Sequence, residues 1–258
     1  MKKISLFVSL SIISIALFAQ VEIVGHRGAS YIAPENTVAS AKLGWELNAD
    51  GVEIDIYMTS DKRVVVSHDK NTKRTSGVDY LIPETKSSIL RKLDVGSWKD
   101  PKYAGEKIPF VEEIFKIIPK DKSKYLVVEI KTGPEIFPAL QKSIKKSKRL
   151  DQMAFIAFNW ETIKKAKELY PNNKCYWLTS SEKELASKIE ECAAIGLDGV
   201  DVHYRLVNKE MMEKANALGL DVWVWTVNDA DEARRVANLG VKSITTDRPG
   251  WLREQLEK

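Results

Sequence analysis

Three carboxylates occupy alternate positions in two apolar segments of this 258-residue chain: Glu53, Asp55 and Glu129. Side chains alternate along a β-strand, so each segment directs its acids to the face opposite its valines and isoleucines. Converging carboxylates are costly to bury without a cation, and oxygen ligands favour Mg²⁺, Ca²⁺ or Mn²⁺ over Zn²⁺. The sequence predicts a divalent-metal site, the alternative being an internal salt-bridge network with Arg27 and Lys131.

Two histidines end apolar segments in the same way, His26 at the end of the first and His68 at the end of the third. Histidine titrates near neutral pH, so this pair can divide general acid and general base roles. Arg27 and Lys131 are the natural anion binders. A hard metal, two cations and two histidines together suit hydrolysis of a phosphate ester. His203 is interpreted as a rim or structural residue.

The periodicity predicts strands followed by helices along the whole chain, with helices that end at glycines. The predicted strands are 21–24, 52–58, 63–67, 125–131, 153–158, 175–178, 199–202, 222–227 and 243–246. The connection between the second and third is too short for a parallel crossover, so these two form an antiparallel hairpin. The other eight predict a (β/α)8 TIM barrel, with an insertion at about 70–109.

In such a barrel the acids point inward near the C-terminal ends of the strands, where barrel enzymes hold their active sites. Trp225, on the seventh barrel strand, is predicted to form an apolar wall for the substrate, whereas Trp223 is predicted to be core. Asp247 ends the last strand and could simply cap the following turn. An open doubly wound sheet is the alternative fold, but the chain has no G-x-G-x-x-G loop.

The N-terminus has the pattern of an export signal, with Lys2 and Lys3 before an apolar run and a small residue at Ala19. We expect removal of residues 1–19 and a mature barrel domain, 20–258, in the periplasm or outside the cell. An uncleaved anchor is the alternative, although the run is short for a membrane span. The formal charge of +4 falls to +2 without the two lysines, which argues against nucleic-acid binding.

The two cysteines, Cys175 and Cys192, do not form a disulfide framework. In an oxidising compartment they could pair, and two buried thiols are at least as compatible with the sequence.

Taken together, these segments resemble the glycerophosphodiester phosphodiesterase family, in order from about Ile23 to Pro249. The segments that carry the resemblance are His-Arg-Gly-Ala at 26–29, Pro-Glu-Asn-Thr at 34–37, Glu-Ile-Asp-Ile at 53–56, Val-Val-Val-Ser-His-Asp at 64–69, Glu-Ile-Lys at 129–131 and Trp-Thr-Val-Asn at 225–228, with 93–98 and 105–109 in the insertion.

The resemblance implies a barrel that hydrolyses glycerophosphodiesters to glycerol 3-phosphate and an alcohol. It implies Glu53, Asp55 and Glu129 as metal ligands and His26 with His68 as the acid and base. Arg27 and Lys131 would hold the phosphate, while the glycerol 2-hydroxyl attacks phosphorus to give a cyclic phosphate that water then opens.

Three other functions stay open at this point. The same barrel could act on lysophospholipids or other lipid phosphodiesters, or bind a phosphodiester without catalysis. A glycosidase is less compatible, because Glu53 and Asp55 lie two residues apart on one strand and do not flank a scissile bond. The expected partner is a small-molecule substrate, with no nucleic acid and no stable membrane anchor after signal removal.

Overall fold

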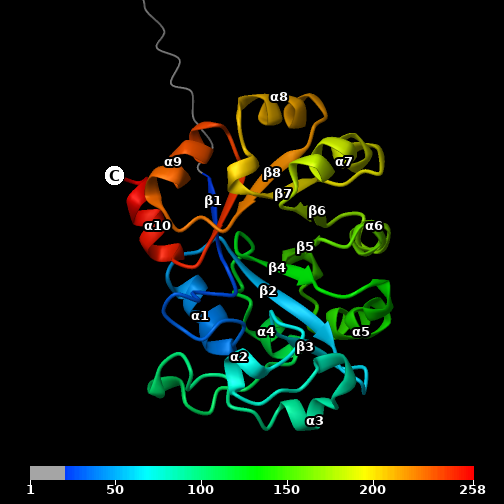
Figure 1. Ribbon diagram of the computed structural model, residues 1–258, viewed down its shortest axis with the longest axis vertical. Helices are drawn as coiled ribbons and strands as arrows, with labels where there is room; N and C mark the ends of the chain where they lie inside the picture. Colours follow the sequence, from blue (N-terminus) through cyan, green and yellow to red (C-terminus); the bar gives the residue numbers. More distant parts are fainter. Residues whose placement is uncertain (1–20) are drawn as a thin grey trace, which may run out of the picture.

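The computed structural model describes residues 21–258, which form a single nine-stranded sheet surrounded by helices (Figure 1). The strands are β1 (Glu22–Gly25), β2 (Gly51–Met58), β3 (Val64–Val66), β4 (Tyr125–Ile130), β5 (Met153–Ala157), β6 (Lys174–Thr179), β7 (Gly199–His203), β8 (Asp221–Trp225) and β9 (Ser243–Thr246). β1 pairs in parallel with both β2 and β9. The eight parallel strands therefore close into a barrel, as predicted.

A helix follows each barrel strand and covers its outer face. The α-helices are α1 (Val38–Glu46), α2 (Lys73–Ser76), α3 (Ser87–Leu90), α4 (Val111–Ile117), α5 (Phe137–Ser147), α6 (Trp160–Leu169), α7 (Glu182–Ala194), α8 (Lys209–Ala217), α9 (Ala230–Asn238) and α10 (Pro249–Leu256). The short 3₁₀ helices are η1 (Ile82–Glu84), η2 (Pro101–Tyr103), η3 (Pro134–Ile136), η4 (Leu150–Gln152) and η5 (Tyr204–Leu206).

The predicted hairpin and insertion are both present. β3 pairs with β2 in antiparallel register, with Ile56 opposite Val66. The chain then forms α2, η1, α3 and η2 before α4, and α2 and α3 lie together at the lower end of the molecule in Figure 1. α3 ends at Leu90, and the chain continues in turns up to Leu93. The insertion therefore contains more local structure than its irregular sequence indicates.

The hydrophobic residues separate into an outer and an inner core. Val52, Ile54 and Ile56 of β2 belong to the large cluster between the strands and the helices. A smaller cluster, which includes Tyr176 and Trp223, fills the barrel interior. Their rings stack with centroids 4.1 Å apart. This inner core closes the N-terminal end of the barrel and leaves polar side chains to its C-terminal end.

The turn after β1 has an unusual backbone. Arg27 and Gly28 both have positive φ angles, 54° and 87°, in the left-handed region that a residue with a Cβ rarely adopts. A Cβ on Gly28 would lie 2.4 Å from the carbonyl carbon of Ser40 in α1. Glycine is therefore required at position 28, where the turn packs directly against the first helix.

Cys175 and Cys192 are both buried and unbonded. Within residues 21–258, no helix combines the length and the apolar character that crossing a bilayer requires. The predicted export signal at 1–19 lies outside the described residues.

We expect Gly28→Ala to lower the free energy of unfolding by at least about 3 kcal/mol, because it combines backbone strain with a steric clash. Gly77→Ala is the matched control, since Gly77 has a φ of 75° and a Cβ there would meet no atom within 4 Å. That variant should lose about 1 kcal/mol. Urea denaturation measures both, and equal losses would contradict the packing argument.

Candidate active site

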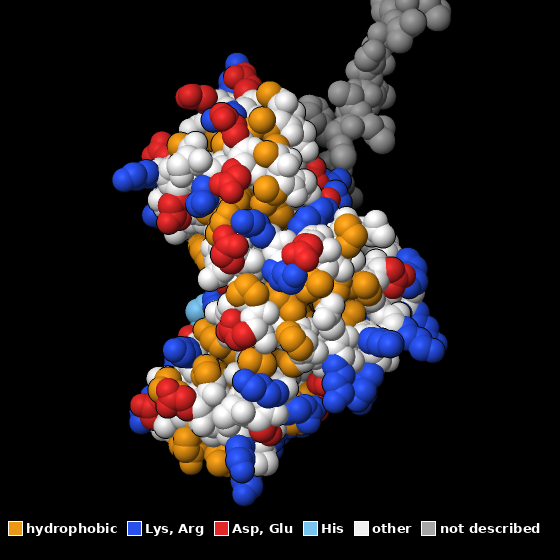
Figure 2. Space-filling view, turned by 90° about the vertical axis from the view of Figure 1, so that its right-hand side faces the viewer, with side chains coloured by type: hydrophobic (Ala, Val, Ile, Leu, Met, Phe, Trp, Pro, Cys, Tyr) orange, Lys and Arg blue, Asp and Glu red, His pale blue; other side chains and the backbone are white. Residues whose placement is uncertain are grey.

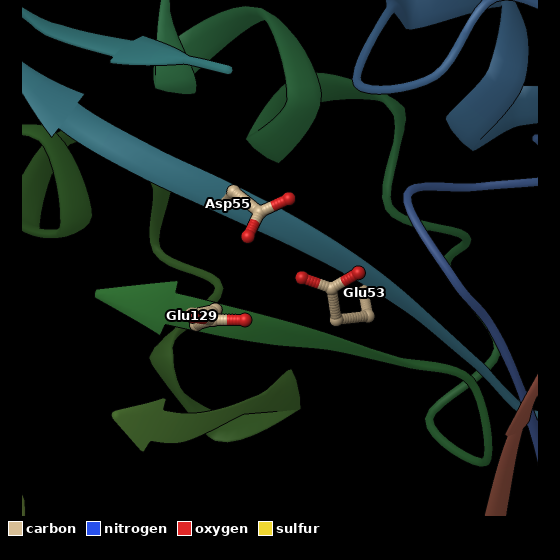
Figure 3. A group of neighbouring side chains, drawn as sticks. All are labelled: Glu53, Asp55 and Glu129. Atoms are coloured by element: carbon tan, nitrogen blue, oxygen red, sulfur yellow. The ribbon is translucent and has the colours of Figure 1, made fainter. Parts of the chain in front are cut away.

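The three predicted metal ligands converge at the C-terminal end of the barrel. Glu53 and Asp55 project from β2, and Glu129 projects from the neighbouring β4, in register with Asp55. Their carboxylates point toward one another in Figure 3, and one oxygen from each lies within 4.8 Å of the others. Glu53 and Asp55 are almost completely buried. The alternation of side chains along both strands therefore predicts their direction correctly.

Two cations flank this acidic cluster. Lys131 Nζ lies 2.8 Å from Glu129 Oε1 and 3.3 Å from Asp55 Oδ1. Arg27 donates its backbone N–H to Glu53 Oε2 at 2.8 Å, and its Nε lies 3.6 Å from Asp55 Oδ2. The left-handed turn at Arg27 thus brings both its backbone amide and its guanidinium to the acids. The predicted metal site and the predicted salt-bridge network are formed by the same residues.

The charges of the cluster are only partly balanced by these cations. Burial, and then the negative charge of Asp55, raises the pKa of Glu129 to about 8. Burial also raises the pKa of Glu53 well above its ordinary value, with a further contribution from Asp55. Burial acts in the same direction on Asp55, but Lys131 and Arg27 hold the pKa of this carboxyl below its usual range. An additional cation would therefore take the place of protons on Glu53 and Glu129.

The donor set fits a divalent metal ion. Glu53 Oε1 and Asp55 Oδ1 are buried and have no hydrogen-bond donor of good geometry among residues 21–258. Buried carboxylate oxygens that accept no hydrogen bond are unusual, and the only donor near Asp55 Oδ1 in residues 21–258 is the Lys131 ammonium at 3.3 Å. Carboxylates as the only side-chain ligands suit Mg²⁺, Ca²⁺ or Mn²⁺.

His26 is held by a carboxylate that lies 221 positions away in the chain. Its Nδ1 lies 2.7 Å from Asp247 Oδ1, which also accepts from Ser30 Oγ, and Asn228 Nδ2 donates to the other oxygen. Burial would raise the pKa of Asp247, but the hydrogen bond from His26 and its other bonds lower it to about 2. A carboxylate accepts hydrogen bonds, so Nδ1 carries the proton and Nε2 carries the lone pair.

His68 is held in the same way from the hairpin side. Its Nδ1 lies 2.8 Å from Asp69 Oδ1, and Arg74 donates to the other oxygen of Asp69 at 2.7 Å. Arg74 also donates two hydrogen bonds to Glu35, which accepts a third from Arg27. α2 of the insertion therefore fixes the side chains that orient both His68 and Arg27.

The two histidines and the acidic cluster open into one cavity of about 240 Å³, here called the inner pocket. Residues with charged or titratable side chains line one part of it: His26, Arg27, Glu53, His68, Glu129, Lys131 and Asp201. Trp225 and Phe158 form an apolar wall, with rings in edge-to-face contact. The outline of the molecule is indented on one side in Figure 2, where a histidine reaches the surface. Every predicted site residue thus lines this pocket, except the Asp55 side chain beneath it.

Four residues of the site were not predicted in these positions. Asn36 donates to Asp55 Oδ2 at 2.8 Å and accepts from the Asp55 backbone N–H at 3.0 Å. Its segment, Pro-Glu-Asn-Thr at 34–37, precedes α1 and has the composition typical of a helix start. Glu35 forms an ion pair with Arg27. Asp247, the residue after β9, forms a hydrogen bond with His26. Asp201 is buried in the pocket wall with an unpartnered oxygen. In the sequence, only the position of Asp201 near the end of a predicted strand indicates that it lies at the mouth of the barrel.

A closed barrel whose mouth combines an acidic cluster, two cations and two carboxylate-held histidines has the architecture of a hydrolase of phosphate esters. Comparison with known proteins agrees. The model of the glycerophosphoryl diester phosphodiesterase family matches residues 26–251. The chain therefore belongs to the glycerophosphodiester phosphodiesterase family, and it is a phosphoric diester hydrolase.

Individual relatives match over nearly their whole length. A glycerophosphodiester phosphodiesterase of Caldanaerobacter subterraneus is 30% identical over 237 residues, which cover 89% of this chain and 95% of that protein. A phosphodiesterase of Oleispira antarctica, solved with the product sn-glycerol-3-phosphate, superposes with a TM-score of 0.85 at 28% identity. The match covers 92% of this chain and 97% of that one.

We expect Asp247→Asn to destabilise the protein in a pH-dependent way. The pKa of Asp247 in the folded protein is about 2, below its value of about 3.9 when unfolded. The ionised Asp247 carboxylate therefore makes its full contribution to the free energy of unfolding above about pH 4, and this contribution is lost as the pH falls through 2. Urea denaturation of both proteins between pH 6 and 2.5 should show a difference in unfolding free energy that shrinks with acidity. A constant difference would contradict an ionised Asp247.

Proposed function

We propose that this chain hydrolyses glycerophosphodiesters to glycerol 3-phosphate and an alcohol, with a divalent cation and two histidines. The observation that carries the proposal is the meeting of three carboxylates, two cations and two histidines in the inner pocket. The family match and the product in the Oleispira antarctica structure support this substrate class.

Glu53, Asp55 and Glu129 would hold the cation, with Mg²⁺ or Ca²⁺ as the first choices and Mn²⁺ as a third. When bound, the ion withdraws electron density from phosphate oxygens and stabilises charge that develops there. Lys131 and Arg27 contact the acidic cluster from either side. Their remaining N–H groups would bind the non-bridging phosphate oxygens, while Trp225 would contact the carbon chain of the glycerol.

The histidines would move protons at the attacking and the leaving oxygen. One accepts the proton of the glycerol 2-hydroxyl as that oxygen bonds to phosphorus, and the other protonates the alcohol oxygen as its bond to phosphorus breaks. The intermediate is a cyclic phosphate, and water then adds to its phosphorus with the two histidines in reversed roles, so that the bond to the 2-oxygen breaks and glycerol 3-phosphate is released. Asp247 and Asp69 hold the Nδ1 protons, so that each Nε2 serves this exchange.

We expect His26→Ala to fold normally and to lose turnover by about 10²- to 10⁴-fold, the usual contribution of a general acid or base. Glu53→Gln should lose turnover as well, because it removes a metal ligand. His203→Ala is the control for the loss of an imidazole, since His203 does not line the inner pocket and touches it only through the edge of the Trp225 ring. Release of glycerol 3-phosphate from glycerophosphoethanolamine measures all three, and full activity of His26→Ala would refute the assignment.

Chelation provides a second test. Treatment with EDTA should abolish the release of glycerol 3-phosphate, and added Mg²⁺ or Ca²⁺ should restore it. The melting temperature should also rise on adding the ion, because the ion binds the folded state, and Glu53→Gln should lack this rise. Unchanged turnover in EDTA would contradict a metal-dependent reaction.

A lysophospholipid is the second candidate substrate. Phe158 is 45% exposed beside the pocket and Trp98 is 41% exposed on the insertion, so apolar surface is available near the mouth for an acyl chain. A human relative named lysophospholipase D is 24% identical over 90% of this chain. Release of lysophosphatidic acid from lysophosphatidylcholine would support this candidate, and its absence beside turnover of glycerophosphodiesters would reject it.

We also propose, from the N-terminal sequence, that the reaction takes place outside the cytoplasm. Fractionation of expressing cells should place the activity in the periplasm or medium, and the exported protein should begin at Gln20. A chain that retains Met1 and sediments with membranes would contradict cleavage.

A further inference from the structure

A second cavity, here called the outer pocket, opens directly beside the inner pocket. It measures about 320 Å³. The two pockets share His26 and Arg27, and the outer one continues between Tyr31 in the turn after β1 and Trp98 with Lys99 in the insertion. A phosphodiester has two ester arms. If Arg27 and Lys131 hold its phosphate, the glycerol arm fits the inner pocket and the second arm needs a separate space.

The outer pocket is the space that meets this need. A third cavity adjoins the inner pocket at His68 and extends toward Asp69, and its volume is only about 10 Å³. That volume is about one water molecule, too little for an alcohol of several carbons. A leaving alcohol of that size would therefore extend between Tyr31 and Trp98.

The loop that carries Trp98 and Lys99 is rigidly built. Asp94 accepts backbone hydrogen bonds from Gly96, Ser97 and Gly105. The Trp98 indole donates to the Val95 carbonyl at 2.8 Å, and Lys99 Nζ donates to the Ser30 carbonyl at 2.7 Å. This last bond joins the insertion to the turn after β1. A preorganised loop of this kind loses little freedom when a ligand binds.

The carboxylates of the outer pocket are already occupied. Glu35 accepts hydrogen bonds from Arg27 and Arg74 on its two oxygens. Asp247 accepts from His26, Ser30 and Asn228. Lys99 has a single acceptor and no ion pair within residues 21–258, so two of its three N–H donors remain for a ligand.

The aromatic faces are occupied as well, by cations of the protein itself. The guanidinium of Arg248 lies 3.9 Å from the ring centre of Tyr31, and Lys99 Nζ lies about 6 Å from the rings of both Tyr31 and Trp98. A trimethylammonium group usually binds in such an aromatic site. Here it would lie beside Lys99 and near Arg248. The charge of Glu35, which would attract it, is already balanced by Arg27 and Arg74, and that of Asp247 is stabilised by three hydrogen bonds.

We propose that the outer pocket binds the leaving alcohol and selects head groups that present hydroxyl, carboxylate or phosphate oxygens to Lys99, over quaternary ammonium head groups. This inference rests on the proposed function. It assigns Lys99, a residue of the insertion, to the choice among substrates, while the groups of the inner pocket act on the phosphate that all substrates share.

The test compares glycerophosphoglycerol with glycerophosphocholine, by kcat/KM with added Mg²⁺ and by calorimetric binding. The wild type should favour glycerophosphoglycerol by about tenfold or more, the effect of one charge-assisted hydrogen bond with added repulsion. Lys99→Met should reduce this preference about tenfold, and Lys99→Arg should keep it. Lys102→Met is the matched control, because Lys102 is an exposed lysine of the same insertion that lines neither pocket.

The outcomes separate the two proposals. An equal preference in the wild type and Lys99→Met, or a wild type that favours glycerophosphocholine, would overturn the assignment of the outer pocket. Absence of hydrolysis with selective binding that Lys99→Met abolishes would reject the proposed reaction and support the pocket. Absence of both hydrolysis and selective binding would reject both. Thermal melting of each variant confirms that it is folded.

Discussion

The site is governed by the repulsion among three carboxylates that approach within 4.8 Å inside a protein. Buried charges at that distance interact strongly, because no water lies between them to screen them. Three neighbouring groups offset part of this repulsion. They are the Lys131 ammonium, directly after β4, the guanidinium and backbone amide of Arg27, and the side-chain amide of Asn36. The left-handed conformation of Arg27 belongs to the same balance, since it directs two donors of one residue to two acids.

A second layer of charges ties the barrel to its insertion. Arg74 contacts both Glu35 and Asp69, and through them it orients Arg27 and His68. These pairs are partly exposed, and exposed pairs contribute little to stability. Their value lies in geometry, because one guanidinium with several donors fixes two carboxylates relative to each other. The insertion thus contributes to the candidate active site through Arg74.

The sequence predicts the barrel and the centre of the site well, because both depend on local patterns. Alternation along β2 and β4 fixes the direction of Glu53, Asp55 and Glu129 without knowledge of the rest of the chain. Asp247 could not be assigned to His26 in this way, since 221 residues separate them and a strand end followed by aspartate also fits a turn. Asn36 was hidden similarly, by a segment typical of a helix start. Pairs such as Asp247 and His26 come together only when the barrel closes, and local sequence patterns do not predict contacts of this kind.

The pairing of β1 with β9 has a consequence for how the chain acquires its activity. β9 is the last strand, so the ring of strands cannot close until residue 246 has left the ribosome. Contacts between such distant parts of a chain form late and slowly. Closure also brings Asp247 to His26, so the hydrogen bond between these two side chains forms in the same step that completes the barrel. A chain that lacks β9 therefore has neither a closed barrel nor a held His26, and the pocket at the barrel mouth is complete only when the last strand has paired.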